Sequence, residues 1–148
     1  MAKILVIYNS MTGNTQLAAQ AVAQGAKDAD AQVALQEARK TTSDDIQSCD
    51  GVAFGSYDAF SYMGGDLKDF FDRVFYPTQG KLEAKPYVAF LTHGGGGGAI
   101  KSLEGLCEAL KLKKAAPSVS VKGRPDDEAL SQLAGLGGRL AMAAVSRS

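Results

Sequence analysis

A loop rich in hydroxyl groups separates a short apolar run from the first helical pattern of the chain. It reads Ser10-Met11-Thr12-Gly13-Asn14-Thr15. Backbone N–H groups at the start of a helix are free and the helix dipole is positive there, so such a loop can bind an anion. Because the loop contains no Lys or Arg, its neutral donors, including the hydroxyls of Thr12 and Thr15, suit a monophosphate better than a triphosphate with magnesium. An ordinary capped helix behind a polar turn would use the same residue types.

A second loop combines aromatic side chains with glycines. It follows an apolar run at residues 51–56, and it carries Tyr57, Phe60 and Tyr62 ahead of the pair Gly64-Gly65. Aromatic rings in such a loop can stack on a planar ligand. The alternative places Phe60 in the core and leaves the tyrosines as surface cover.

A third loop is a run of glycines at residues 94–98, directly after His93. Glycines allow backbone amides to approach a ligand closely. The run is not a P-loop, because Ile100 stands where that motif requires a glycine. His93 either donates a hydrogen bond to a ligand or serves only to end the strand before it.

Strand-like and helical patterns alternate along the chain, and this alternation can bring the three loops together. Apolar or alternating runs predict strands at residues 4–8, 32–36, 51–56, 87–92 and 118–121. Helical spacing predicts helices between them, most clearly in the apolar stripe Leu67, Phe70, Phe71, Val74 and Phe75. Thr42 is expected to cap a short helix.

This alternation predicts an α/β fold, a three-layer sandwich with a five-stranded parallel sheet, as one domain over residues 1–148. Ligands of such sheets bind beyond the carboxyl ends of the strands. That location selects the loops after the first, third and fourth strands. The last helix contains Gly135, Gly137 and Gly138, each of which weakens it by about 1 kcal/mol relative to Ala, so we expect it to depend on packing.

Composition argues against several classes of function. Sixteen Lys and Arg balance sixteen Asp and Glu, so no basic surplus supports a nucleic-acid partner. No apolar run approaches the roughly 20 residues that span a bilayer, and Met1 leads directly into the first strand. We therefore expect no membrane segment, no leader peptide and a cytoplasmic setting. Two cysteines without a CxxC pair, and one histidine, argue against a disulfide scaffold and a metal site.

The first loop resembles the phosphate loop of the flavodoxin-like family, in which Ser or Thr and one further residue precede Thr-Gly-Asn-Thr. Residues 55–73 resemble the family pattern G-S-P-T-x-F-G-x-M-x-G-x-x-K-x-F-x-D-R, which is usual in its quinone-reductase branch. Tyr57, Asp58 and Ser61 depart from that pattern. The resemblance implies the flavodoxin-like sandwich with strand order 2-1-3-4-5 and FMN as the cofactor.

By this resemblance the first loop would hold the phosphate, the second would cover the flavin ring, and the third would reach its pyrimidine edge. No catalytic side chain is expected. The residues expected to bind FMN are Ser10, Met11, Thr12, Gly13, Asn14, Thr15, Ser56, Tyr57, Asp58, Ala59, Phe60, Tyr62, Met63, Gly64, His93, Gly94, Gly95 and Gly96.

Three functions remain open on this basis. The first is a flavodoxin-type carrier that moves single electrons between redox partners, in which a carbonyl of the Gly64-Gly65 turn would face N5 of the flavin. The second is an FMN-dependent NAD(P)H-quinone oxidoreductase with a small-molecule donor and acceptor. The third is a flavin-binding module without catalysis. The small size of the chain favours the carrier, whereas its neutral charge and its second loop keep the reductase open as an alternative. The oligomeric state is left open as well.

Overall fold

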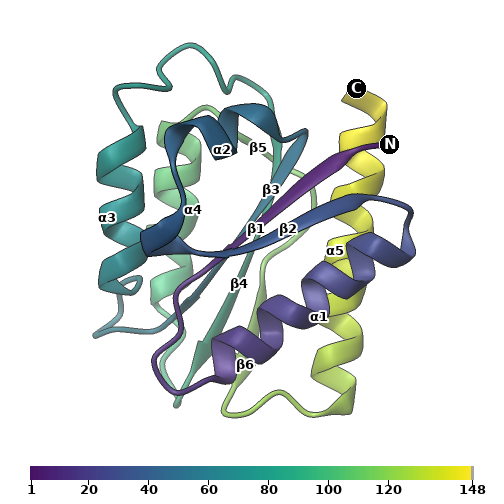
Figure 1. The fold of residues 1–148 in the computed structure, drawn as a ribbon. Helices are drawn as coiled ribbons and strands as arrows, with labels where there is room; N and C mark the ends of the chain where they lie inside the picture. Colours follow the sequence, from purple (N-terminus) through teal and green to yellow (C-terminus); the bar gives the residue numbers. More distant parts are fainter. Residues whose placement is uncertain (148) are drawn as a thin grey trace.

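The computed structural model describes the backbone of residues 1–147 and the side chains of residues 1–145. A parallel sheet lies between two layers of helices (Figure 1). The strands are β1 (Lys3–Tyr8), β2 (Gln32–Glu37), β3 (Gly51–Tyr57), β4 (Pro86–His93), β5 (Lys113–Lys114) and β6 (Val119–Lys122). The helices are α1 (Asn14–Asp28), α2 (Ser43–Ser48), α3 (Gly65–Val74), α4 (Ala99–Ala109) and α5 (Asp127–Arg147), with a 3-10 turn η1 (Ala38–Lys40).

The order of the sheet, β2-β1-β3-β4 followed by the outer strand, confirms the expected 2-1-3-4-5 arrangement. The outer position is shared by two short strands, because β5 and β6 both pair in parallel with β4. The predicted strand at residues 118–121 corresponds to β6, whereas β5 was not predicted. Its two lysines give no apolar pattern, and Pro117 lies between the two pieces, where it has no N–H to donate to a ladder.

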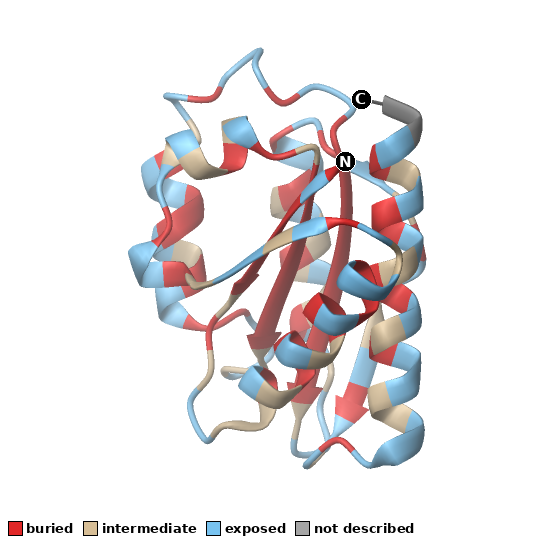
Figure 2. Cartoon of the chain, turned by 45° about the vertical axis from the view of Figure 1, so that its right-hand side comes forward, coloured by how far each residue is buried: buried red, intermediate tan, exposed pale blue. Residues whose placement is uncertain are grey.

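Helices cover both faces of the sheet, which explains why its central strands are mostly apolar. Along β1, Ile4 and Val6 pack with α1 and α5, while Leu5 and Ile7 pack with α3 and α4 on the opposite face. The central strands are accordingly buried along their length, whereas β2 at the edge is partly exposed (Figure 2). Of the helices in the described part of the chain, none is long and apolar enough to cross a membrane.

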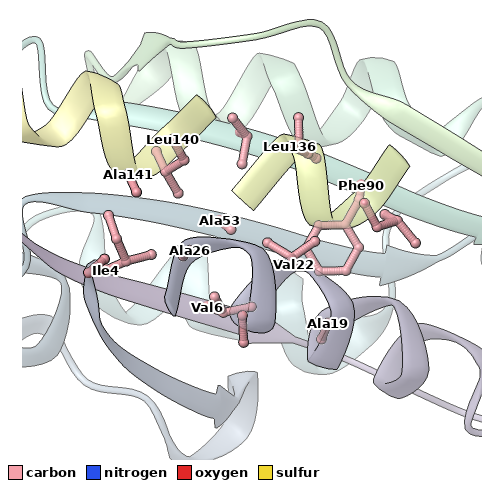
Figure 3. Close-up of a cluster of buried hydrophobic side chains, with 14 of the residues drawn as sticks. Ile4, Val6, Ala19, Val22, Ala26, Ala53, Phe90, Leu136, Leu140 and Ala141 are labelled. Carbon is pink, nitrogen blue, oxygen red and sulfur yellow. The ribbon is translucent and has the colours of Figure 1, made fainter. Parts of the chain in front are cut away.

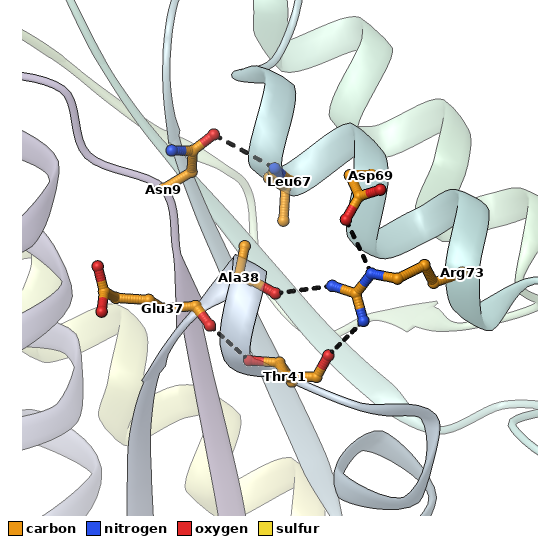
Figure 4. A network of polar contacts seen from close by, with 7 residues as sticks. All are labelled: Asn9, Glu37, Ala38, Thr41, Leu67, Asp69 and Arg73. Carbon is orange, nitrogen blue, oxygen red and sulfur yellow. Dashed lines mark hydrogen bonds and ion pairs between the residues drawn. The ribbon is translucent and has the colours of Figure 1, made fainter.

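The helix α3 is held from both its apolar and its polar side. Its stripe packs on Phe54, whose ring centroid lies 5.1 Å from that of Phe71. On the polar side, Arg73 donates to the Asp69 carboxylate at 2.8 Å and to the carbonyl oxygens of Thr41 at 2.8 Å and Ala38 at 3.0 Å (Figure 4). A guanidinium can serve these acceptors together because its donors are fixed in one plane. The C-terminal half of α3 is therefore anchored to the segment after β2.

The helices α1 and α5 pack against each other on one face of the sheet (Figure 3). A Cβ at Gly25 would overlap the carbonyl oxygen of Ala134, and one at Gly137 would overlap that of Val22. Gly137 therefore contributes to packing as well as weakening the helix, since only a residue without a side chain permits this approach. A Cβ at Gly135, by contrast, would meet no atom within 4 Å.

Gly137 and Gly135 provide a matched pair of substitutions. Gly137→Ala should destabilise the protein by about 1–3 kcal/mol, because the helices must move apart or strain. Gly135→Ala should stabilise it by about 0.5–1 kcal/mol, since alanine loses less backbone entropy in a helix. Urea unfolding of the two variants beside the wild type measures both effects. Equal effects at the two positions would contradict the close contact of α1 and α5.

Candidate functional site

The first predicted loop joins β1 to α1 at the carboxyl edge of the sheet. The Ser10 hydroxyl oxygen accepts hydrogen bonds from the N–H groups of Gly13 at 3.1 Å and Gln16 at 3.3 Å. Gly13 has a φ of 101°, a left-handed conformation that favours glycine. Among the described residues, the N–H groups of Thr12, Asn14 and Thr15 donate to no acceptor. Free donors at the positive end of a 15-residue helix fit a phosphate.

The two threonines expected to donate to a phosphate differ in their surroundings. Thr12 is exposed, and its hydroxyl has no hydrogen-bond partner among the described residues. Thr15 is only 1% exposed, and its Oγ1 lies 2.8 Å from Oγ1 of Thr92 at the end of β4. Thr12 can therefore offer its hydroxyl to a ligand directly, whereas the hydroxyl of Thr15 also ties the first loop to the fourth strand.

The start of α3 is fixed by side chains beneath the second loop. The Ser56 hydroxyl donates to the carbonyl of Tyr57 at 2.7 Å and accepts from the N–H of Gly64 at 2.8 Å. Asn9 accepts from the N–H of Leu67 at 3.2 Å (Figure 4). Ser56 and Met63, both expected to touch the cofactor, are 0% and 2% exposed, so they support the loop from inside.

One carbonyl of the Gly64-Gly65 turn, which was expected to face N5 of the flavin, already has a hydrogen-bond partner in the structure. The carbonyl of Gly64 accepts the N–H of Lys68 at 3.1 Å, which is the first hydrogen bond of α3. Turning this peptide would break the start of the helix. Gly64 has an additional packing role, because a Cβ there would overlap the Asn9 side chain.

The tight turn of the second loop lies instead between Ala59 and Tyr62. These two residues exchange backbone hydrogen bonds of 2.8 Å and 3.1 Å, while Phe60 and Ser61 have φ values of 54° and 68°. Such conformations cost non-glycine residues on the order of 1–3 kcal/mol each. The ring of Phe60 is fully exposed, at 103%, so the alternative that it belongs to the core is wrong. Neither residue type signals a positive φ in the sequence.

The Asp58 carboxylate connects the second loop to the third. It accepts from the N–H groups of Ser61 at 2.7 Å, Gly97 at 3.0 Å and Ala99 at 3.2 Å. Burial raises the pKa of Asp58, but these hydrogen bonds and the nearby His93 outweigh it and lower the pKa below its usual value. Asp58 was expected to bind the cofactor; in the structure its contacts are to the loop backbone and the start of α4.

The third loop presents an open glycine backbone beside His93. The Nδ1 atom of His93 accepts the N–H of Gly95 at 3.0 Å. A Cβ at Gly94 or Gly95 would meet no atom within 4 Å. In the described part of the chain, the N–H groups of Gly94 and Gly96 donate to no acceptor. These amides can donate to a ligand at this edge.

The structure brings the three loops to one end of the sheet, as predicted. Met11, Phe60 and Tyr62 are exposed there by 71%, 103% and 40%, so apolar side chains protrude from the first two loops. One residue at this end was missed by the sequence analysis. Arg124, in the connection from β6 to α5, lines a hollow of about 330 Å³ together with Thr12, Gly13 and Asn14. No sequence pattern connects it with a loop more than a hundred positions earlier.

Known proteins share both the sequence pattern and the fold. The family model described as Flavodoxin matches residues 6–135. A flavodoxin of Aquifex aeolicus is 37% identical over 99 residues, covering 66% of this chain and 54% of that protein. An NAD(P)H dehydrogenase (quinone) of Archaeoglobus fulgidus is 31% identical over 127 residues, covering 64% of this chain and 65% of that protein. The matches thus span roughly half to two thirds of these relatives' length.

Solved structures agree in fold. A flavodoxin from the domain Archaea has a TM-score of 0.89 at 22% identity, covering 97% of this chain and 99% of that one. The rubredoxin oxygen:oxidoreductase of Desulfovibrio gigas has a TM-score of 0.89 at 20% identity, covering 98% of this chain and 36% of that one. The fold and the three loops place the chain in the flavodoxin-like class of α/β proteins. The chain belongs to the flavodoxin family.

The Asp58 bridge predicts a stability difference that depends on pH. Asp58→Ala should lower the free energy of unfolding by about 1–2 kcal/mol, because three N–H groups lose a charged acceptor in a loop where solvent screens the charge. Since the pKa of Asp58 is lowered in the folded protein, its contribution is present above the unfolded pKa of about 3.9 and is lost as pH falls through the folded pKa.

Urea unfolding at neutral pH and at steps into the acid range measures this difference. Asp66→Ala is the control, because Asp66 lies exposed in the first turn of α3 without a side-chain hydrogen bond to any described residue. A difference between wild type and Asp58→Ala that persists unchanged at the lowest pH would contradict the role given to the carboxylate.

Proposed function

We propose that this protein binds FMN at the carboxyl edge of its sheet and carries single electrons between redox partners. The observation that supports this most strongly is the set of free N–H groups of Thr12, Asn14 and Thr15 at the start of α1. They offer a phosphate several donors and the positive end of a helix dipole. Because the chain belongs to the flavodoxin family, we infer that the ligand that carries this phosphate is a flavin.

The ring portion of FMN fits the other two loops by the chemistry of their exposed groups. The amides of Gly94 and Gly96 can donate to carbonyl oxygens of the pyrimidine edge. Tyr57 and Tyr62 remain the aromatic residues expected to cover the ring, and the fully exposed Phe60 stands at the tip of the same loop. Bound FMN supplies reversible electron chemistry, while the protein binds and orients it.

A carrier needs its cofactor at an accessible edge rather than a deep catalytic pocket. The apolar side chains Met11 and Phe60 flank this edge and are exposed by 71% and 103%, which suits contact with a partner surface. The 31% identical quinone-reducing relative favours a second candidate, an FMN-dependent NAD(P)H-quinone oxidoreductase. That enzyme would accept electron pairs from a nicotinamide.

Removing the free hydroxyl of the first loop should weaken binding of FMN specifically. Thr12→Ala should cost about 1–2 kcal/mol of FMN affinity, because a charged acceptor loses one donor. Riboflavin, which lacks the phosphate, should bind wild type and variant equally. Quenching of flavin fluorescence measures both dissociation constants. A parallel loss of riboflavin affinity would show that Thr12 acts on the ring or on the fold.

The proposed function is tested by stepwise anaerobic photoreduction of the FMN-loaded protein. We expect a long-wavelength absorbance band that rises and then falls as the first and second electrons enter, and slow reduction by NADPH. Chromatography of the released flavin should identify FMN. Reduction in a single two-electron step, with rapid bleaching by NADPH, would replace the carrier with the reductase, and recovery of FAD would contradict the assignment of the cofactor.

A further inference from the structure

Arg124 is placed beside the phosphate loop by a turn at the end of β6. The N–H of Gly123 donates to the carbonyl of His93 at 2.8 Å, and Gly123 has a φ of 73°. This turn leads the chain out of the sheet before Pro125, which is buried. Arg124 consequently lines the hollow of about 330 Å³ that Thr12, Gly13 and Asn14 also line.

The guanidinium of Arg124 has no partner among the described residues, in either ion pairs or hydrogen bonds. Three acidic residues follow closely, yet none lies within 4.0 Å of it in an ion pair. Asp126 accepts the N–H of Ala129 at 2.8 Å and thereby caps α5, while Asp127 and Glu128 occupy the first turn of that helix. An exposed arginine without an anionic partner is available to a ligand.

The donors of the first loop are all neutral, so no cation of the loop itself balances the negative charge of a bound phosphate. A phosphate monoester near neutral pH carries close to two negative charges. Arginine matches phosphate oxygens with two parallel N–H donors. Arg124 lines the same hollow as Thr12, Gly13 and Asn14, and that hollow continues along α1 to Gln20. Its long side chain can therefore reach a phosphate held in this hollow.

We propose that Arg124 is a phosphate-recognition residue that gives the site its preference for a flavin with a terminal phosphate over one without it. This inference rests on the proposed binding of FMN. Arg124 positions and selects the phosphate and has no role in electron transfer. The neutral loop holds the phosphate, and the guanidinium balances part of its charge.

The test compares the dissociation constants of FMN and riboflavin, measured by quenching of flavin fluorescence at low and high ionic strength. Arg124→Gln should weaken FMN binding about threefold to tenfold at low salt, the range expected for one solvent-exposed charge-assisted contact. The loss should shrink at high salt, because salt screens an exposed pair. Riboflavin affinity and the urea midpoint of the flavin-free protein should stay at their wild-type values.

Two further variants separate this contact from general charge. Arg124→Lys keeps the charge and should retain most of the FMN affinity. Lys122→Gln removes an equal charge two positions earlier, at a residue that lines only the neighbouring hollow formed by the end of β6 and the start of α5, whereas Arg124 lines both hollows. It should bind FMN as the wild type does.

Wild-type affinity for FMN in Arg124→Gln would overturn the inference, and so would equal losses of FMN and riboflavin. An equal loss in Lys122→Gln would overturn it as well, since the effect would then be one of net charge. In each of these cases the wild type still binds FMN and the proposed function stands. A wild type that binds neither flavin would overturn both.

Discussion

The contact between α1 and α5 leaves no space for side chains where Gly25 and Gly137 face the opposite backbone. This close approach fixes the spacing of the two helices at these positions, because a side chain at either glycine would overlap the opposite backbone. The start of α1 carries the first loop, and the start of α5 follows the turn that carries Arg124. The contact of α1 with α5 therefore helps to bring two segments far apart in the sequence to one hollow.

Polar side chains then define the loops that the sheet brings together. Asn9 and Ser56 lie below the second loop and hold the N-terminal end of α3, Thr15 and Thr92 join the first loop to β4, and Asp58 joins the second loop to the third. Each of these groups is satisfied by backbone or by another side chain, so the loops keep their shape without a ligand. What remains unsatisfied among the described loop residues is a set of N–H groups, and these define where an anion or a carbonyl can bind.

The fold was predictable wherever burial of an element requires a regular pattern of apolar residues in the sequence. The strands β1, β3 and β4 are apolar because both their faces are covered, the stripe of α3 faces one core, and Thr42 forms the expected cap with Asp45. The two lysines of β5 show no such apolar pattern. The locations of the three loops also followed from strand order. The roles of Asp58 and Arg124 did not, because Asp58 meets Gly97 across 39 positions and Arg124 reaches the first loop only through tertiary packing. The turn at Phe60 and Ser61 was hidden because neither residue favours a positive φ.

The divided outer strand has a consequence for how folded copies of this protein meet. A regular, exposed strand at the edge of a sheet is a template on which another chain can add a strand, and long apolar edges promote aggregation. Here β5 offers only two residues, both lysines, and β6 offers four that end in Lys122, with Pro117 between the two pieces. A neighbouring strand that paired with either piece would lose its ladder after a few residues and would meet positive charge. The interruption therefore protects this edge against strand addition while keeping β4 paired along most of its length.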